Sequence, residues 1–337
     1  MAYLPSSNRY TNGMKYSYCG KSGLQLPKIS LGLWHNFGHT DDFEHSKSIL
    51  EYAFDQGITH FDLANNYGPP VGSAEENFGK IFRNSLSAHR DEVIVSTKAG
   101  HLMWDGPYGD GSSRKNLVSS LNQSLKRLQL DYVDVFYSHR YDGVTPIEET
   151  MQALIDIVKS GKALYAGISK YPPELAEKCY RMLESQGVRC LIYQDRYSML
   201  ARDVENGALE TAHCNGIGFC AFSPLAQGLL TDRYLNGIPS DSRVAKNGFL
   251  KKEQVTPERI TIIRELNDLA LERGETLAQM ALSWLLHDKR VTTVLVGSSS
   301  VEQLKNNLEA LHAPAFSQEI LETIRGIVSK YPLNLPK

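Results

Sequence analysis

Several short strings in the sequence place ionisable side chains directly after apolar runs. The candidates are Asp62 and Tyr67 in FDLANNYG (61–68), Lys98 in STKAG (96–100) and His139 in YSHR (137–140). A carboxylate, a phenol, an ammonium and an imidazole are together the parts of a site that transfers protons. These residues are far apart in the sequence, so we expect them to meet only if the fold brings several strand ends to one place.

The elements that would position these residues alternate regularly between strand and helix. In one predicted helix, Leu117, Leu121, Leu125 and Leu128 form a stripe on a single face. The strand–helix pairs are 29–33 with 43–56, 58–61 with 74–83, 93–97 with the helix around 117–128, 133–137 with 147–160, 164–167 with 174–185, 191–193 with 204–214, 218–222 with 257–273 and 277–287, and 294–296 with 301–311. Because the strands are short and apolar, we expect them to be buried on both faces.

Eight such units in 337 residues predict a (β/α)8 barrel, the TIM-barrel fold, with 1–337 as a single domain. In this fold the active site forms from loops at the C-terminal ends of the strands, where all four candidates fall. An open, doubly wound sheet also alternates strands and helices. However, no G-x-G-x-x-G follows the first strand, so the barrel is the better interpretation.

Two segments extend the repeating pattern. Residues 15–28 contain a Gly-Lys-Ser-Gly turn and are expected to form an N-terminal β-hairpin that plugs the bottom of the barrel. Residues 229–252 are rich in Gly, Ser, Arg and Asn and are expected to form a long loop after the seventh strand. Loops of this length are often functional.

Composition restricts the possible partners. The net charge is −2 with 22% charged residues, which does not favour nucleic acid or an anionic membrane surface. No apolar run approaches the roughly 20 residues of a transmembrane helix, so no membrane insertion is expected. The N-terminus lacks the apolar region of a signal peptide, and the five cysteines form no CxxC; we expect reduced thiols in the cytoplasm. Histidine and cysteine spacing predicts no metal site.

Over roughly residues 14–330 the chain resembles the aldo-keto reductases. The D-x-x-x-x-Y-G string of that family is matched by Asp62, Tyr67 and Gly68, its STK lysine by Lys98, and its histidine at the end of the fourth strand by His139. The branch that contains bacterial glyceraldehyde-3-phosphate reductases and potassium-channel β-subunits is the most similar. The strings that carry this likeness are GLWHNFG (32–38), NNYGPP (65–70), MWDGPYGD (103–110), FSPLAQGLLTDRYLNGIP (222–239) and GSSSVEQLKNN (297–307).

The four candidate residues suggest how such a site reduces a carbonyl group. Free tyrosine has a pKa of about 10, so it holds its proton at neutral pH. Lys98 would lower the pKa of Tyr67 if Asp62 fixes the ammonium and keeps it charged. Tyr67 would then be the general acid, and a neutral His139 would hydrogen-bond the carbonyl oxygen. With no metal expected, the hydride must come from an organic cofactor, and the resemblance implies a nicotinamide.

The resemblance also implies which residues hold that cofactor. Ser169 and Gln194 match positions that hydrogen-bond the carboxamide, and Phe222 matches the aromatic residue that stacks on the ring; the alternative for Phe222 is ordinary core packing. Further matches are Ser223, Leu225, Gln227 and Gly228 in a pyrophosphate loop, Ser299, Gln303 and Asn307 at the adenosine end, and Trp34, Asp62 and Lys170 as additional cofactor contacts. The helix predicted over 301–311 begins just after Ser299, and the backbone N–H groups at its start would be available to phosphate.

Arg233 and Arg243 favour NADP(H) over NAD(H). They lie where the channel-β branch places Lys and Arg against the ribose 2′-phosphate, and guanidinium groups bind a phosphate dianion well. The alternative is that both are solvated loop residues. Three departures from the pattern weaken the preference: Ser300 stands where Lys or Arg is frequent, Lys170 where Asn or Arg is usual, and Asn306 where an acidic residue is common.

The resemblance implies small aldehydes as substrates, such as glyceraldehyde 3-phosphate and methylglyoxal, the latter suggesting detoxification. Trp34, Trp104 and Tyr141 are candidates for the walls of a substrate pocket around Tyr67 and His139, although Trp104 could instead pack within its loop. Members of the branch commonly assemble, so we expect a homo-oligomer, a tetramer or an octamer.

A second hypothesis is a redox-sensing regulatory subunit that binds the nicotinamide cofactor, docks on a membrane channel and turns over little. The likeness to channel β-subunits motivates it, but that likeness is an analogy of fold. Channel β-subunits carry Asn where this chain has His139, and the chain shows no basic inactivating arm. These features favour the enzyme.

Overall fold

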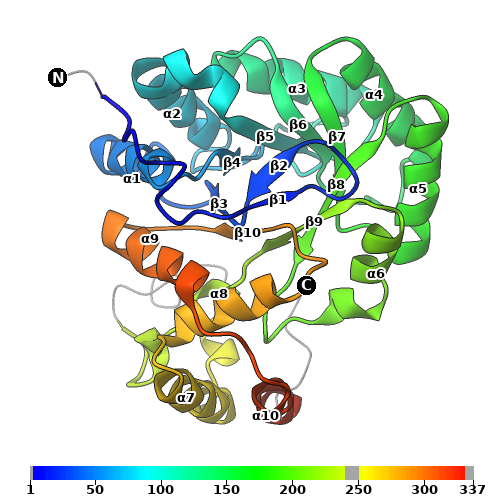
Figure 1. Ribbon diagram of the computed structural model, residues 1–337. Helices are drawn as coiled ribbons and strands as arrows, with labels where there is room; N and C mark the ends of the chain where they lie inside the picture. The colour runs from blue at the N-terminus through cyan, green and yellow to red at the C-terminus, as the bar shows by residue number, and fades with distance from the viewer. Residues whose placement is uncertain (1–2, 240–249, 331–337) are drawn as a thin grey trace.

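The computed structural model describes residues 3–239 and 250–330, and in it eight parallel strands close into a barrel (Figure 1). The strands follow one another around the barrel in the order β10-β3-β4-β5-β6-β7-β8-β9. They are β3 (Ile29–Gly32), β4 (His60–Asp62), β5 (Ile94–Ala99), β6 (Val133–Ser138), β7 (Ala163–Ser169), β8 (Cys190–Arg196), β9 (Gly218–Phe222) and β10 (Thr293–Val296). The predicted (β/α)8 barrel is confirmed.

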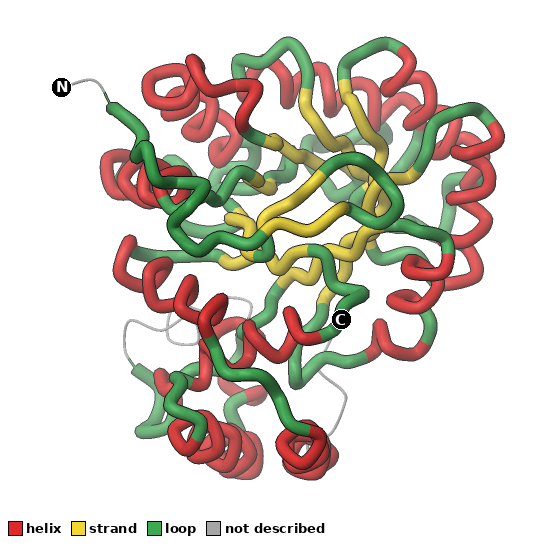
Figure 2. The backbone as a smooth tube through the Cα atoms, in the orientation of Figure 1, coloured by secondary structure: helices red, strands yellow, loops and turns green. Residues whose placement is uncertain are grey.

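Helices surround the barrel and cover its outer face (Figure 2). They are α1 (Phe43–Asp55), α2 (Ser73–Ile81), α3 (Arg114–Leu128), α4 (Ile147–Lys159), α5 (Pro173–Ser185), α6 (Ala208–Cys214), α7 (Pro257–Glu272), α8 (Leu277–His287), α9 (Val301–Leu308) and α10 (Gln318–Ser329). Shorter helical segments are η1 (Phe82–Leu86), η2 (Ser87–Glu92), η3 (Asp203–Asn206), η4 (Ala226–Gly228), η5 (Asp232–Tyr234), η6 (Lys252–Gln254) and η7 (Glu309–His312). The predicted leucine stripe of α3 buries Leu117, Leu121 and Leu128.

Local sequence sets where these helices begin and end. Thr276 caps α8 in a capping box with Gln279, and Ser317 accepts the N–H of Ile320 to start α10. The predictions did not include α10, which lies beside α7 (Figure 1). The helix expected over 204–214 is divided into η3 and α6, because Gly207 has a φ of 132° that other residues rarely adopt.

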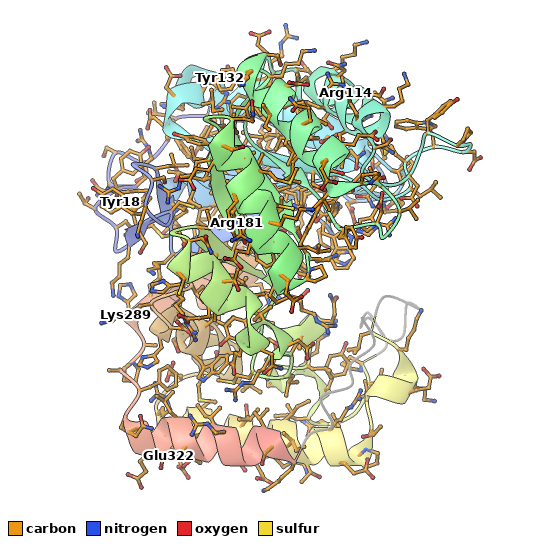
Figure 3. All side chains as sticks on the ribbon, turned by 90° about the vertical axis from the view of Figure 1, so that its right-hand side faces the viewer. Tyr18, Arg114, Tyr132, Arg181, Lys289 and Glu322 are labelled. Carbon is orange, nitrogen blue, oxygen red and sulfur yellow. The ribbon has the colours of Figure 1, made fainter. Side chains whose placement is uncertain are left out.

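The N-terminal hairpin closes one end of the barrel. Its strands are β1 (Tyr16–Tyr18) and β2 (Gln25–Pro27), and the backbone N–H of Lys21 donates to Gly216 O, just before β9, at 2.8 Å. Figure 3 shows Tyr18 on the same side of the molecule as Lys289, which precedes β10. The hairpin therefore covers the end where the strands begin, opposite the predicted site, as expected.

The barrel interior combines an apolar cluster with a polar group of residues. The apolar cluster consists of Cys19, Leu26, Val135, Tyr137, Leu191, Ile192, Cys220 and Leu295. The polar group consists of His60, Asp62, Ser96, Lys98 and Gln194, all buried. Alternation along the strands places both groups inside the barrel, since residues two apart face the same side. The residues that alternate with the polar ones contact the surrounding helices instead: Phe61 packs on Phe78 of α2, and Thr97 donates to Glu75 of α2.

Within the two described ranges, no helix combines the length and apolar character needed to cross a membrane.

Candidate active site

Asp62 and Lys98 form a buried ion pair at the C-terminal ends of β4 and β5. Lys98 Nζ donates to Asp62 Oδ2 at 2.5 Å and to the backbone oxygen of Leu63 at 2.6 Å. Burial acts to lower the pKa of Lys98, but the charge of Asp62, its hydrogen bond to the ammonium and the nearby Tyr67 together outweigh burial, and the pKa lies above its ordinary value. Lys98 therefore stays charged inside the barrel.

Tyr67 lies in the loop after β4, next to this pair. Its ring centroid is 5.3 Å from Lys98 Nζ and 6.2 Å from each of the rings of His139 and Trp34. Burial raises the pKa of Tyr67, and the Lys98 ammonium offsets only part of that rise. The lowering expected from Lys98 alone is thus outweighed in this structure, and the phenol keeps its proton at neutral pH.

His139 directly follows β6 and carries a neutral imidazole. Its backbone N–H donates to Ala99 O at 2.9 Å, which holds it at the end of β5. Burial, followed by the charges of Lys98 and Lys170, keeps the pKa of His139 well below its ordinary value. His139 Nδ1 is buried and has no hydrogen-bond partner within residues 3–239 and 250–330, and the ring of His101 lies edge-on to it, with the ring centroids 4.5 Å apart. The four side chains singled out in the sequence therefore lie together.

Asp62 receives further hydrogen bonds from residues that the sequence interpretation missed or assigned elsewhere. Ser96 Oγ donates to Asp62 Oδ1 at 2.6 Å, and Gln194 Nε2 donates to the same oxygen at 3.2 Å. Ser96 in turn contacts His60 Nε2 at 2.9 Å. The signal that could have identified His60 and Ser96 is strand alternation, because each precedes a charged candidate by two positions.

Two of the predicted cofactor residues bury polar atoms that have no hydrogen-bond partner among the described residues. These atoms are Ser169 Oγ at the end of β7 and Asn307 Nδ2 in α9. Nearly all buried polar groups in folded proteins are hydrogen-bonded, so these two atoms fit a polar ligand. Phe222 is partly exposed at the end of β9, and Lys170 Nζ lies 5.2 Å from its ring centroid. These positions fit a nicotinamide cofactor.

The loop after β9 has an unusual backbone. Ser223, Ala226 and Gln227 have φ angles of 53°, 47° and 60°, in the left-handed region that side-chain-bearing residues rarely adopt, and Gly228 has a φ of 95°. Leu225, another predicted cofactor residue, lies in the same loop between Ser223 and Ala226. Clusters of such conformations are typical of ligand-binding sites.

The two arginines predicted to bind the 2′-phosphate follow this loop. Arg233 is exposed in η5, whereas Arg243 lies outside the described residues.

At the start of α9, the predicted adenosine-binding residues bind one another. Gln303 Oε1 accepts from the backbone N–H of Ser299 at 2.7 Å and from its hydroxyl at 3.1 Å. Ser300, one of the three departures from the family pattern noted in the sequence, is the N-cap of α9 and accepts the N–H of Gln303. Asn306 accepts from Gln279 of α8 at 2.8 Å, so its amide joins two helices.

The aromatic candidates for a substrate pocket differ in their placement. Trp34 is the one whose ring lies near Tyr67. Trp104 is half-buried in the loop between β5 and α3, and in the described part of the chain no ring contact joins it to the four clustered residues. Tyr141 packs on Tyr171, with ring centroids 5.8 Å apart.

Comparison with known proteins agrees with this geometry. A model described as the aldo/keto reductase family matches residues 28–329. A protein of Escherichia coli O157:H7 named L-glyceraldehyde 3-phosphate reductase is 55% identical, covering 99% of this chain and 98% of the relative. Proteins named probable voltage-gated potassium channel subunit beta, from Oryza sativa subsp. japonica and Arabidopsis thaliana, are 35% and 36% identical, each covering 95% of this chain and 98% of the relative. This chain therefore belongs to the aldo/keto reductase family and is an oxidoreductase.

Proposed function

We propose that this protein reduces small aldehydes to alcohols with NADPH, using Tyr67 as the general acid. The buried Asp62–Lys98 pair beside a protonated Tyr67 and a neutral His139 is the observation that carries the proposal. Because relatives with 54% and 55% identity are named L-glyceraldehyde 3-phosphate reductase, glyceraldehyde 3-phosphate is the first substrate to test, and methylglyoxal is the second.

Each of the four side chains has a distinct part in this proposal. Tyr67 holds the proton that the carbonyl oxygen must receive. A neutral His139 keeps one N–H group, with which it can orient that oxygen beside Tyr67. Lys98 has three N–H donors, of which two are used by Asp62 and Leu63. The third remains to stabilise the Tyr67 phenolate once its proton has moved.

The same proposal assigns residues to the cofactor, which supplies the hydride when bound. Ser169 and Gln194 would hold the carboxamide, Phe222 would contact the ring, and Asn307 would bind at the adenosine end. The unpaired Ser169 and Asn307 atoms support this assignment. Lys170, Ser223, Leu225, Gln227, Gly228, Ser299, Gln303, Arg233 and Arg243 complete the proposed contacts, with Trp34, Trp104, Tyr67 and His139 around the substrate.

The deciding experiment compares the wild type with Tyr67→Phe in NADPH-dependent reduction of glyceraldehyde 3-phosphate and methylglyoxal. Loss of the phenol should lower kcat by ~10²–10⁴-fold, which is typical of general acid catalysis. Fluorescence titration should give an unchanged Kd for NADPH, because the ring remains. Tyr18→Phe on the exposed hairpin is the matched control. Near-wild-type turnover of Tyr67→Phe would remove Tyr67 from the role of acid.

The relatives named as channel β-subunits motivate one alternative, a regulatory subunit that binds NADPH tightly and turns over little. A single burst in which the bound NADPH is oxidised, followed by turnover that is limited by exchange of the cofactor, would support that alternative. Steady multiple turnover would support the enzyme. We also propose that the chain forms a tetramer or an octamer, which sedimentation velocity would measure.

A further inference from the structure

A series of hydrogen bonds crosses the barrel interior and ends at Asp62. Thr293 Oγ1 on β10 lies 2.6 Å from Ser30 Oγ on β3, and Ser30 Oγ lies 2.9 Å from His60 Nδ1 on β4. His60 Nε2 lies 2.9 Å from Ser96 Oγ on β5, which donates to Asp62 Oδ1 at 2.6 Å. All five residues are at most 2% exposed. We refer to these five residues as the buried series.

The direction of the buried series follows from its last member. The carboxylate of Asp62 has no proton to give, so the hydroxyl of Ser96 must donate to it. Ser96 then has only lone pairs left for His60, which means that Nε2 of His60 carries the proton. Nδ1 of His60 must accept from Ser30, and Ser30 must accept from Thr293. Every proton in the series therefore points toward Asp62.

His60 can act as the link because its imidazole is neutral. Burial lowers the pKa of His60 to about 4, with a small contribution from the Lys98 ammonium, although the Asp62 carboxylate acts to raise it. A neutral imidazole has one donor and one acceptor on opposite sides of the ring, and the protonated form would have two donors. Only the neutral form can accept from Ser30 and donate to Ser96 at the same time.

We propose that His60 is a positioning residue, which acts through Ser96 to orient the Asp62 carboxylate and thereby the Lys98 ammonium beside Tyr67. Ser96 and Gln194 occupy Oδ1 of Asp62, which leaves Oδ2 for Lys98. Without the bond from Ser96, either carboxylate oxygen can compete for the ammonium. Displacement of a reacting group by about 1 Å can lower a rate by ~10²-fold. This inference rests on the proposed reductase function.

The other groups that face Asp62 lie outside the buried series. They are Lys98 on β5, Tyr137 on β6, Gln194 on β8, Cys220 on β9 and Tyr67 in the loop after β4. A change in the pH profile of a His60 variant therefore reports the orientation and charge of Asp62. If Asp62 accepts weaker hydrogen bonds in such a variant, its negative charge is less well solvated. That charge then acts more strongly on Tyr67 and raises the pKa of the Tyr67 phenol.

The first test uses three variants. His60→Leu removes both hydrogen bonds, His60→Gln keeps a donor for Ser96, and His213→Leu on the exposed side of α6 is the matched control. His60→Leu should lower kcat by about tenfold or more with a Kd for NADPH within about twofold of wild type. In alcohol oxidation, the acid limb of its kcat profile should move to higher pH. His60→Gln should recover most of kcat.

A purely structural role for His60 gives a different result. Both His60 variants would then lose stability and activity together, with an unmoved pH profile, and the inference would be overturned. Where His60→Leu does not fold, Thr293→Val serves instead, because it keeps the shape of the side chain and removes only the first donor. It should show a smaller loss of kcat and a pH shift in the same direction; an unmoved profile would equally overturn the inference.

The second test does not depend on activity. In protein labelled with ¹⁵N-histidine, His60 should show the Nε2–H tautomer and should not titrate between pH 8 and about 5. Thr293→Val should change the ¹⁵N shift of His60 Nδ1. An Nδ1–H tautomer would reverse the direction of the buried series and overturn the inference even if the enzyme is active. A wild type that reduces no aldehyde would refute the proposed function, and with it the inference, whatever the tautomer.

Discussion

Lys98 and His139 show how burial and neighbouring charge combine differently at adjacent residues. Both are almost fully buried, and burial acts to lower the pKa of each. Lys98 has a carboxylate in direct contact and remains charged, whereas His139 faces cations and remains neutral. One buried carboxylate, Asp62, thus separates the charge states of two basic groups around Tyr67.

Ser169 provides a prediction in which stability and binding change in opposite directions. Its hydroxyl is buried and has no partner in the part of the chain that the structure describes, so Ser169→Ala should leave the cofactor-free protein equally stable or up to ~1 kcal/mol more stable. The same change should weaken NADPH binding by about 1 kcal/mol, because a hydrogen bond to the ligand is lost. Urea denaturation without cofactor and fluorescence titration measure the two effects.

Ser120→Ala is the matched control for Ser169→Ala. Ser120 is buried in α3 and donates to Asn116 at 2.8 Å. Its loss should destabilise the protein by about 1 kcal/mol and leave NADPH binding unchanged. If Ser169→Ala behaves in the same way, Ser169 does not hold the cofactor.

Sequence alone predicts the four clustered residues because their positions at strand ends are visible in the pattern. Asp62, Tyr67, Lys98 and His139 each follow an apolar run, and the barrel gathers those ends. The hydrogen bonds around Asp62 could not be predicted in this way. They depend on strand register, in which Asp62 lies opposite Ser96, and register cannot be read from one strand's sequence.

Among the larger elements, the loop after β9 provides a test of cofactor choice. If Arg233 and Arg243 bind the 2′-phosphate, replacing either with alanine should weaken NADPH by ~1–3 kcal/mol more than NADH, since only NADPH loses a charge-assisted bond. Titration with both cofactors measures the difference. Arg181→Ala on the exposed face of α5 is the control and should change neither affinity. Equal weakening of both cofactors would contradict the assignment.

The contact between α2 and α3 gives a prediction opposite to helix propensity. Replacing Gly79 with alanine in an isolated helix would add about 1 kcal/mol of stability. In this protein the new Cβ would lie 2.3 Å from the backbone oxygen of Arg127, so Gly79→Ala should instead destabilise the fold by ~1–3 kcal/mol. Urea denaturation measures the free energy of unfolding.

Gly326→Ala is the matched control in α10. Apart from the backbone of α10 itself, no heavy atom of the described residues lies within 4 Å of its added Cβ, so this change should stabilise the protein by ~0.5–1 kcal/mol. A gain of stability in both variants would show that α2 and α3 can separate without cost.

Sequence periodicity predicts the barrel helices well because each buries an apolar stripe. It did not predict α10, which follows the last strand–helix unit and buries Ile324, Ile327 and Val328 beside α7. Sequence periodicity also predicted one helix over 204–214, where the structure has η3 and α6 on either side of Gly207, because the spacing of apolar residues does not reveal the positive φ of that glycine. The elements that were missed or merged therefore lie where tertiary packing or backbone conformation decides the outcome.

For the whole molecule, buried neutral histidines make stability depend on pH. His60 and His139 both have pKa values below the ordinary value of about 6.5. Below pH ~6.5 the unfolded chain binds protons that the folded protein does not, so stability is lost as pH falls, for His60 until about pH 4. Each histidine contributes a slope of up to ~1.4 kcal/mol per pH unit.

Urea denaturation of the wild type and His60→Gln between pH 7 and 5 tests this dependence, because the carboxylates are the same in both proteins. His60→Gln should show a shallower slope than the wild type, by up to the contribution of one proton. Equal slopes would mean that the folded protein can protonate His60 in this window.

The division of the site between strands and loops has a consequence for redesign. The buried series and Gln194 lie in β3, β4, β5, β8 and β10, whereas Trp34, Trp104 and the backbone around Gln227 lie in connecting loops. Grafting the segments that carry Trp34, Trp104 and Gln227 from a distant relative, with Tyr67 and His139 kept, should therefore exchange the aldehydes and cofactor that are accepted, while the polar residues of the barrel still set the acidity of Tyr67. A library for new reductases would randomise those segments and leave Tyr67, His139 and the interior polar residues untouched.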